Sequence, residues 1–323
     1  MTPANANSGF PAYAWMDGAL VPWNDARLHV RTQGAFWGAN VFEGVRGYWQ
    51  PARERIGFFC VDEHLARLRD SAKCLRMPVT TTNAQFHEAL AALAEANRYT
   101  DHVHVVIGLA YGMGPRCESL GHIDVVHTHI TAIEMPRSPH LAQGISAGTS
   151  SWRRISDESM PPRIKTGANY HNSRLAHQEA LEAGYQTALI LNNKGTVAES
   201  PGACVAAVMG DTIVSPPSTA GALPGITLRN VETLARAQGL KFTQREIDRS
   251  ELYLADEVFL CGTLAEILPV TSIDRIAIGD GTPGPVVRRL QQQYDQLVGI
   301  AQMGAPGRSE APMPERAARR VAP

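Results

Sequence analysis

Residues 160–170, with the sequence MPPRIKTGANY, hold a lysine in a setting that no other lysine of the chain shares. The remaining lysines have ordinary explanations: Lys73 lies in an amphipathic stretch, Lys194 in an Asn-Asn-Lys-Gly turn, and Lys241 after a helical pattern. Lys165 instead lies in a short irregular segment with apolar, small and aromatic neighbours. A lysine in a dry site loses much of its preference for the charged form, and a neutral amine can attack a carbonyl carbon. The segment therefore makes Schiff-base chemistry at Lys165 the first hypothesis to test, while on this segment alone an exposed loop lysine is the commoner reading.

The composition around this segment is that of a globular protein with two domains. The 323 residues exceed the size at which one core usually keeps growing. A net charge of −1 gives no electrostatic reason to expect nucleic acid or an anionic membrane as a partner. No apolar run has the length of a transmembrane helix, and the N-terminus lacks the regions of a signal peptide. The five cysteines show no CxxC spacing, so we expect a reduced, cytoplasmic protein.

The first half of the chain has the pattern of a compact α/β unit. Apolar positions at Leu65, Leu68, Ala72 and Leu75 follow helical spacing, and Asp62 can cap the helix that they predict. A second helix is predicted at 83–96, and strands are predicted at 13–18, 41–48 with a continuation through 56–59, 103–110 and 123–133.

The second half is richer in predicted strands. Close-spaced strands are expected at 187–191, 196–200, 203–209 and 212–215, and helices at 170–183, 227–238 and 285–300. The Pro-rich segment 136–139 and the following Gln-Gly pair interrupt the pattern, so we expect a linker there. The predicted organisation is a small N-terminal α/β domain at 1–136, a linker at 137–147, a larger domain at 148–303 and a disordered tail at 304–323.

Three further segments of the second half fit one ligand that carries a phosphate and a protonated ring nitrogen. Residues 221–227, GALPGIT, run into a predicted helix, where free backbone N–H groups and the hydroxyl of Thr227 suit a phosphate; a plain helix cap is the alternative. Glu199 ends an apolar strand and can pair with a protonated ring nitrogen, as pyridoxal phosphate requires; an exposed acid is the alternative. The backbone after Gly262 can form an anion site or a structural turn.

Taken in their order along the chain, these segments resemble the class IV (fold-type IV) pyridoxal-phosphate aminotransferases. The branched-chain amino acid aminotransferases show the closest likeness, over about residues 12–300. The resemblance implies an α/β fold of the fold-type IV kind, with a small N-terminal α/β domain and a larger, β-rich, barrel-like domain that binds the cofactor. It rests on VFEGVRGY at 41–48, HLARL at 64–68, KTGANY at 165–170, Glu199, LPGIT at 223–227, LYLADEVF at 252–259 and Gly262-Thr263.

The same resemblance implies roles for individual residues. Lys165 would hold pyridoxal 5'-phosphate covalently and later move the proton, Tyr170 would hydrogen-bond the phenolic oxygen, and Glu199 would keep the ring nitrogen protonated. The residues implied to hold the phosphate are Arg67, Ile226, Thr227 and Thr263. From spacing alone, Arg67 lies off the apolar stripe of its helix and would be solvated. The residues implied on the substrate side are Trp37, Phe42, Gly44, Arg46, Tyr48, Met113, Leu264 and Ala265, with core packing as the alternative for the aromatic ones.

The implied function is a ping-pong aminotransferase. It would move the amino group of an amino acid, most simply a branched-chain L-amino acid, to a 2-oxo acid such as 2-oxoglutarate or pyruvate. The family usually builds its sites near a subunit interface, which implies a homodimer. Alternatives with the same fold are a D-amino acid or (R)-amine transaminase and a lyase of the aminodeoxychorismate type. A non-catalytic scaffold would not need Lys165, Tyr170 and Glu199 together.

The chain also departs from the family pattern. The usual Arg-Pro pair is absent from residues 101–105, and Arg116 is a candidate for the compensating cation. Cys204 stands where the family often has asparagine, and Trp37 where a tyrosine is usual. His122, His127 and His129 suggest a metal, but no cysteine or paired carboxylate motif accompanies them, so we predict no metal site.

Overall fold

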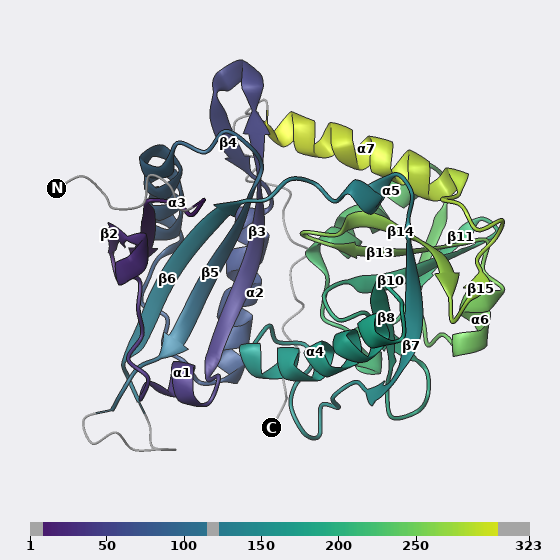
Figure 1. Cartoon of the computed structure of the whole chain (residues 1–323), viewed down its shortest axis with the longest axis horizontal. Coiled ribbons are helices and arrows are strands. Elements are labelled where there is room, and N and C mark those ends of the chain that lie inside the picture. Colours follow the sequence, from purple (N-terminus) through teal and green to yellow (C-terminus); the bar gives the residue numbers. More distant parts are fainter. Residues whose placement is uncertain (1–8, 115–122, 303–323) are drawn as a thin grey trace, which may run out of the picture.

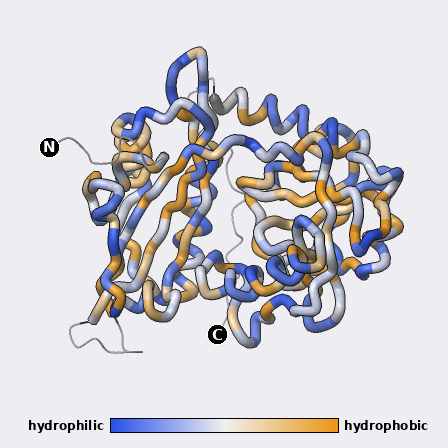
Figure 2. The backbone as a smooth tube through the Cα atoms, in the orientation of Figure 1, coloured by the Kyte–Doolittle hydropathy of each residue, from blue (hydrophilic) through white to orange (hydrophobic). Residues whose placement is uncertain are grey.

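The computed structural model describes residues 9–114 and 123–302, which form two β-sheets with helices packed on them (Figure 1). The first sheet is built from residues up to 134, and the second from residues 145 onward. This arrangement confirms the predicted α/β fold with a β-rich second part. Hydrophobic residues concentrate along the strands of both sheets, which form the cores (Figure 2).

The first sheet is antiparallel and six-stranded, in the order β2-β1-β6-β5-β3-β4. Its strands are β1 (Tyr13–Met16), β2 (Ala19–Pro22), β3 (Asn40–Gln50), β4 (Arg55–Phe58), β5 (Val103–Tyr111) and β6 (Val126–Glu134). The predicted strand at 123–133 therefore begins three residues later than expected. Successive side chains of a strand point to opposite faces, so β3 presents Val41 and Val45 to the core and Phe42 and Arg46 to the other face.

Two helices cover the core face of this sheet. They are α2 (Val61–Cys74) and α3 (Asn83–Asn97), while the short α1 (Gln33–Phe36) lies at the sheet end. Leu65 and Leu68 of α2 are fully buried, as their helical spacing predicts. The prediction that Asp62 caps α2 is wrong, because the N-cap is Cys60, two residues earlier, and the helix begins at Val61. Asp62 lies in the first turn, where a carboxylate still complements the helix dipole.

The second sheet is mixed and nine-stranded, in the order β12-β11-β10-β13-β14-β7-β8-β9, with β15 paired to β14. Strands β13 and β14 pair antiparallel and are joined by a tight turn at residues 263–265. Strand β7 begins inside the segment that the sequence predicts as a linker. The strands are β7 (Ile145–Arg153), β8 (Thr187–Leu191), β9 (Val197–Glu199), β10 (Cys204–Met209), β11 (Thr212–Ser215), β12 (Lys241–Gln244), β13 (Glu257–Gly262), β14 (Glu266–Ile273) and β15 (Ile276–Ala277).

Four helices accompany the second sheet. They are α4 (Gly167–Glu182), α5 (Ile226–Ala237), α6 (Arg249–Tyr253) and α7 (Pro285–Gln302). The N-terminus of α7 is fixed by Glu257 of β13, whose carboxylate accepts hydrogen bonds from the Val286 and Val287 amides at 2.8 Å each. Short 3-10 turns occur at Trp23–Asp25, Pro51–Arg53, Pro139–Leu141 and Ser218–Ala220.

The two parts of the chain are joined by more than the segment between β6 and β7. Tyr48 of β3 is buried in the hydrophobic cluster of the second part, where its ring packs edge-on against Phe59. Phe59 in turn packs against Tyr294 of α7. Aromatic side chains from the first part thus complete the core of the second. Within the described ranges, no helix combines the length and the apolar character needed to cross a bilayer.

Candidate active site

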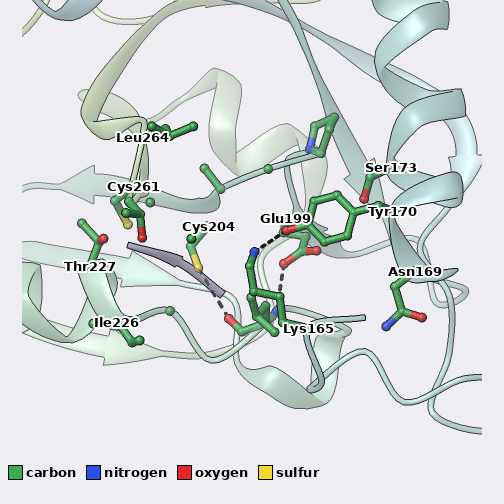
Figure 3. A pocket seen from close by; sticks show the side chains of 18 of the residues that line it. Lys165, Asn169, Tyr170, Ser173, Glu199, Cys204, Ile226, Thr227, Cys261 and Leu264 are labelled. Atoms are coloured by element: carbon green, nitrogen blue, oxygen red, sulfur yellow. Dashed lines mark hydrogen bonds between the residues drawn. The ribbon is translucent and has the colours of Figure 1, made fainter. Parts of the chain in front are cut away.

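A cavity lies where the two parts of the chain meet, and residues from both line it (Figure 3). Ten of the residues predicted for the site line it together: Phe42, Gly44, Arg67, Lys165, Tyr170, Glu199, Ile226, Thr227, Thr263 and Leu264. Five other predicted residues are not among the lining residues: Trp37, Arg46, Tyr48, Met113 and Ala265.

Lys165 is held in place by its backbone. It lies two residues before α4, and its N–H donates to the hydroxyl of Ser71 on α2 at 3.1 Å. Its carbonyl accepts the amide N–H of Phe42 on β3 at 3.0 Å. The next residue, Thr166, donates its hydroxyl to the Asn40 carbonyl at 2.6 Å. These bonds attach the lysine segment of the second part to the first sheet and leave the side chain free to enter the cavity.

The amine of Lys165 is enclosed by two aromatic rings. Its Nζ lies 4.8 Å from the ring centroid of Phe42 and 4.9 Å from that of Tyr170, and it donates a hydrogen bond to the Tyr170 hydroxyl. The two rings lie 5.0 Å apart. In Figure 3 the amine points at the Tyr170 hydroxyl, with the carboxylate of Glu199 behind it. The amine therefore faces the cavity rather than bulk solvent.

Glu199 places a buried carboxylate at the same point. Its Oε1 pairs with the Arg154 guanidinium at 2.8 Å, and its Oε2 accepts the Leu223 amide N–H at 2.8 Å. Burial raises the pKa of Glu199, while the positive charge of Arg154 and the Leu223 hydrogen bond act to lower it. Arg154 is itself buried, and it also donates to the Gly221 carbonyl at 3.1 Å. The Arg154 guanidinium and the Leu223 N–H thus hold the two oxygens of the carboxylate.

The opposite end of the cavity is an open helix N-terminus. Helix α5 begins at Ile226 after Gly225, and no side chain caps it. Ile226 and Thr227 line the cavity at this end. A side chain at Gly225 would lie 2.6 Å from the sulfur of Cys204, so only glycine lets the loop pass this close to β10. Free N–H groups at a helix start, with the dipole behind them, suit a phosphate.

Arg67 adds a cation at this end, and its position contradicts the expectation from helical spacing. Instead of being solvated, its side chain is only 13% exposed, because Glu43 of β3 reaches it with both carboxylate oxygens at 2.7–2.8 Å. A third bond runs from Arg67 Nη1 to the Pro224 carbonyl at 2.7 Å. His64 also contacts Glu43, at 2.7 Å. Burial raises the pKa of Glu43, but hydrogen bonds from Arg67 and His64 outweigh it and hold the pKa below its ordinary value.

Several lining residues were not predicted from the sequence. The most consequential are Arg154 and His104, and the others include Asn169, Ser173, Cys204 and Cys261. His104 lies on β5 opposite Arg46, with its ring over Gly44. Burial, followed by the charges of Arg46 and Lys165, lowers the pKa of His104 to about 4, so its ring is neutral at pH 7. Strand alternation does carry a signal here, because Val103 and Val105 face the core and therefore turn His104 to the cavity side.

The remaining predicted residues do not line the cavity. Arg46 is buried, and neither its Nε nor its Nη1 has a hydrogen-bond partner among the described residues. Trp37 follows α1 and is 39% exposed. His127 pairs with Asp17 at 2.8 Å, and the part of the chain that the structure describes contains no cluster of three metal-ligating side chains. Arg116 and His122 lie outside the described residues.

These groups fit pyridoxal phosphate. The cofactor requires an amine to bind its aldehyde, an acid beside its ring nitrogen and an anion site for its phosphate. Lys165, Glu199 and the start of α5 with Arg67 supply the three, and all of them line one cavity. The uncapped helix start is the most informative of these observations, because helix N–H groups normally find a capping side chain or a ligand.

Comparison with known proteins agrees with this geometry. The family model for amino-transferase class IV matches residues 40–273. The branched-chain-amino-acid aminotransferase of Escherichia coli (strain K12) is 36% identical over 284 residues, which is 87% of this chain and 91% of the relative. The enzyme of that name from Pseudomonas aeruginosa is 37% identical over 289 residues, covering 88% and 92% of the two chains. A crystal structure of the branched-chain amino acid aminotransferase of Thermobaculum terrenum in its PLP form superposes with a TM-score of 0.83 at 38% identity, covering 91% of this chain and 95% of that one. The chain therefore belongs to the class IV aminotransferase family.

Proposed function

We propose that this protein is a pyridoxal-phosphate aminotransferase that moves the amino group of a branched-chain L-amino acid to a 2-oxo acid such as 2-oxoglutarate. One observation carries the proposal: the amine of Lys165, the carboxylate of Glu199 and the open N-terminus of α5 line a single cavity. Relatives that carry the name of this activity match nearly the full length of the chain.

The residues of the cavity divide the work of holding the cofactor. The amides of Ile226 and Thr227 with the guanidinium of Arg67 would hold the phosphate, and Glu199 would hold the protonated ring nitrogen. When bound, pyridoxal phosphate supplies an aldehyde that accepts amines and a ring that withdraws electrons. Arg154 keeps a positive charge against Glu199, which favours the ionised carboxylate in spite of its burial.

Proton transfer is assigned to Lys165. Once its amine is free, it would take the proton from the α-carbon of the substrate and return it to the carbon bonded on the other side of the substrate nitrogen, so that one base serves both positions. The Tyr170 hydroxyl orients the amine through a hydrogen bond. Phe42 and Tyr170 shield the amine from water on the aromatic side. The backbone of the turn at residues 263–265 would bind the carboxylate of the substrate.

A panel of amine donors tests this proposal. With 2-oxoglutarate as the acceptor, we expect L-leucine to give a kcat/KM at least about 10-fold above that of L-alanine, because an apolar pocket rewards each additional carbon. The matching D-amino acids and (R)-amines should react more slowly still. Consumption of 2-oxoglutarate and formation of glutamate measure the rate.

Other outcomes of the panel would favour the related activities. Faster reaction with D-alanine or an (R)-amine than with L-leucine would replace the proposed donor class by its mirror image. Release of pyruvate from aminodeoxychorismate without any amino acceptor would indicate a lyase. A protein that binds no pyridoxal phosphate and reacts with no donor would end the assignment.

We further propose that the protein works as a homodimer in the cytoplasm. Large apolar side chains are exposed together near α1: Val30 is 75% exposed, Phe36 61% and Val125 46%. The Gln33 N–H donates to the Gly112 carbonyl, and the Gly112 N–H donates to the Val125 carbonyl, so α1 and Val125 lie at the same end of the first sheet. An exposed apolar patch of this kind fits a second copy of the chain. The cysteines within the described residues are free thiols, in keeping with a reducing compartment.

Light scattering during size-exclusion chromatography tests the dimer. We expect a mass twice the 35.0 kDa of one chain, and Phe36→Glu should shift it toward the mass of one chain by placing a charge in the interface. Leu254→Glu, a change at a side chain that is 86% exposed elsewhere on the second part, is the matched control. A wild-type protein with the mass of one chain at micromolar concentration would contradict the proposal.

A further inference from the structure

The turn that borders the cavity ends in an unusual residue. Residues 263–265 connect β13 to β14, and Gly262 pairs with Glu266 across the turn. Glu266 has a φ of 51°, in the left-handed region. Glycine is the usual residue at this point of a three-residue hairpin turn, because it adopts the left-handed conformation without steric strain. The side chain of Glu266 must therefore contribute something that glycine would not.

The carboxylate of Glu266 joins three separate segments of the chain. It is buried, with 2% of the residue exposed. Its Oε1 accepts the hydroxyl of Tyr48 on β3 at 3.2 Å, and its Oε2 accepts Nε of Arg137 at 2.8 Å. Arg137 lies in the connection between the two sheets and also pairs with Asp295 of α7. One side chain thus fastens the turn to the first sheet, to the connection and, through Arg137, to the last helix.

A second side chain reinforces the same junction. Nε2 of Gln291 on α7 donates to the carbonyl of Ile267, the residue after Glu266, at 2.9 Å. The same nitrogen donates to the carbonyl of Leu141 in the connection at 2.8 Å. The start of β14 is therefore held against the connection on two sides. Because the turn and β14 are continuous, a shift of Glu266 would displace Thr263 and Leu264, which line the cavity.

We propose that Glu266 is a positioning residue, which, together with Arg137 and Tyr48, sets the distance between the turn at 263–265 and the first sheet. The inference rests on the proposed function, in which the backbone of this turn binds the substrate carboxylate. Glu266, Arg137 and Tyr48 are not among the residues that line the cavity, so they act only through the turn. Displacing a binding group by about 1 Å can cost about 10²-fold in rate, so the junction controls how well substrate is held.

Arg137→Met tests the role without burying a new charge, because the arginine side chain is 34% exposed and methionine keeps much of its apolar length. In the holoenzyme with L-leucine and 2-oxoglutarate, we expect KM for L-leucine to rise by about 10-fold, with kcat changed by less than about 3-fold. The absorbance of the bound cofactor should stay as in the wild type, and the affinity for pyridoxal phosphate should fall by less than KM rises, because Arg67, Ile226 and Thr227 still hold the phosphate. Arg137→Lys should restore part of the loss, and Glu266→Gln should raise KM while keeping the bond to Tyr48.

The matched control is Arg245→Met. Arg245 pairs with Glu251 at 2.6 Å in the same part of the chain, but neither residue lines the cavity. This variant should leave KM unchanged. If Arg137→Met and Glu266→Gln fold and leave KM unchanged, or if both lower cofactor affinity as much as they raise KM, the positioning role is overturned while the aminotransferase stands. A wild-type protein that reacts with no amine donor would overturn both.

Discussion

Lys165→Ala is expected to remove the visible absorbance band of the bound cofactor and to lower kcat by at least about 10³-fold, since one amine provides both the covalent attachment and the proton transfer. The change should leave the fold intact. The hydrogen bonds that hold this segment use the backbone N–H and carbonyl of residue 165, to Ser71 and Phe42, and alanine keeps both. The change removes the contact of the amine with the two rings, which is worth about 0.5–1 kcal/mol, and its hydrogen bond to the Tyr170 hydroxyl. Absorbance spectra and steady-state rates at saturating donor measure the two effects.

Lys194→Ala is the matched control. Its side chain is 72% exposed and pairs only at the surface with Glu246, so both the band and kcat should match the wild type. Added methylamine can return part of the proton-transfer rate to Lys165→Ala if the missing group is only an amine. A Lys165→Ala protein that keeps the band and more than about a tenth of the wild-type kcat would contradict the assignment of this residue.

The sequence predicts the helices and strands correctly where the apolar residues follow a regular helical spacing or form a continuous run. Helix α2 follows from the spacing of Leu65 and Leu68, and β8 and β11 have the bounds that their apolar runs predict. Strand β7 was not predicted. Its sequence ISAGTSSWR is small and polar, and it follows a Gln-Gly pair that resembles a loop. It becomes a strand because β14 and β8 pair with it on both sides, which is a long-range cause that no local pattern contains.

The site residues also divide into those that a local sequence pattern predicts and those that only the fold explains. Lys165, Glu199 and the loop before α5 were found because each stands in a segment whose local sequence fits its chemistry. Arg67 shows the limit, since its helical position predicts exposure and only Glu43, on a strand 24 residues away, explains its burial. No local pattern predicts a role for Arg154. It follows another arginine, and nothing near it in the sequence indicates that it pairs with Glu199. Buried ion pairs between distant segments are properties of the fold, not of a motif.

Arg154→Met is the second change with a large expected effect. Arg154 and Glu199 are both almost fully buried, with side chains 5% and 8% exposed, so removing the cation leaves a carboxylate without its partner. Breaking a buried pair in this way typically costs about 3–5 kcal/mol in the free energy of unfolding. The melting temperature of the apoprotein and its unfolding by urea measure this effect without any cofactor. Arg153→Met, at the exposed neighbouring arginine, is the matched control and should change stability by less than about 0.5 kcal/mol.

The same variant should change the pH dependence of the holoenzyme, with a sign that follows from the pKa of Glu199. Burial raises this pKa and Arg154 opposes the increase, so without Arg154 the pKa rises further and a larger share of the carboxyl groups is protonated at a given pH. A neutral carboxyl cannot hold the ring nitrogen protonated, so we expect kcat at pH 7 to fall by about 10²–10³-fold. Because the carboxylate re-forms as the pH rises, the acid limb of kcat/KM should move to higher pH in Arg154→Met and stay in place in Arg153→Met. An acid limb that does not move, in a folded Arg154→Met protein, would show that Glu199 keeps its charge without this arginine.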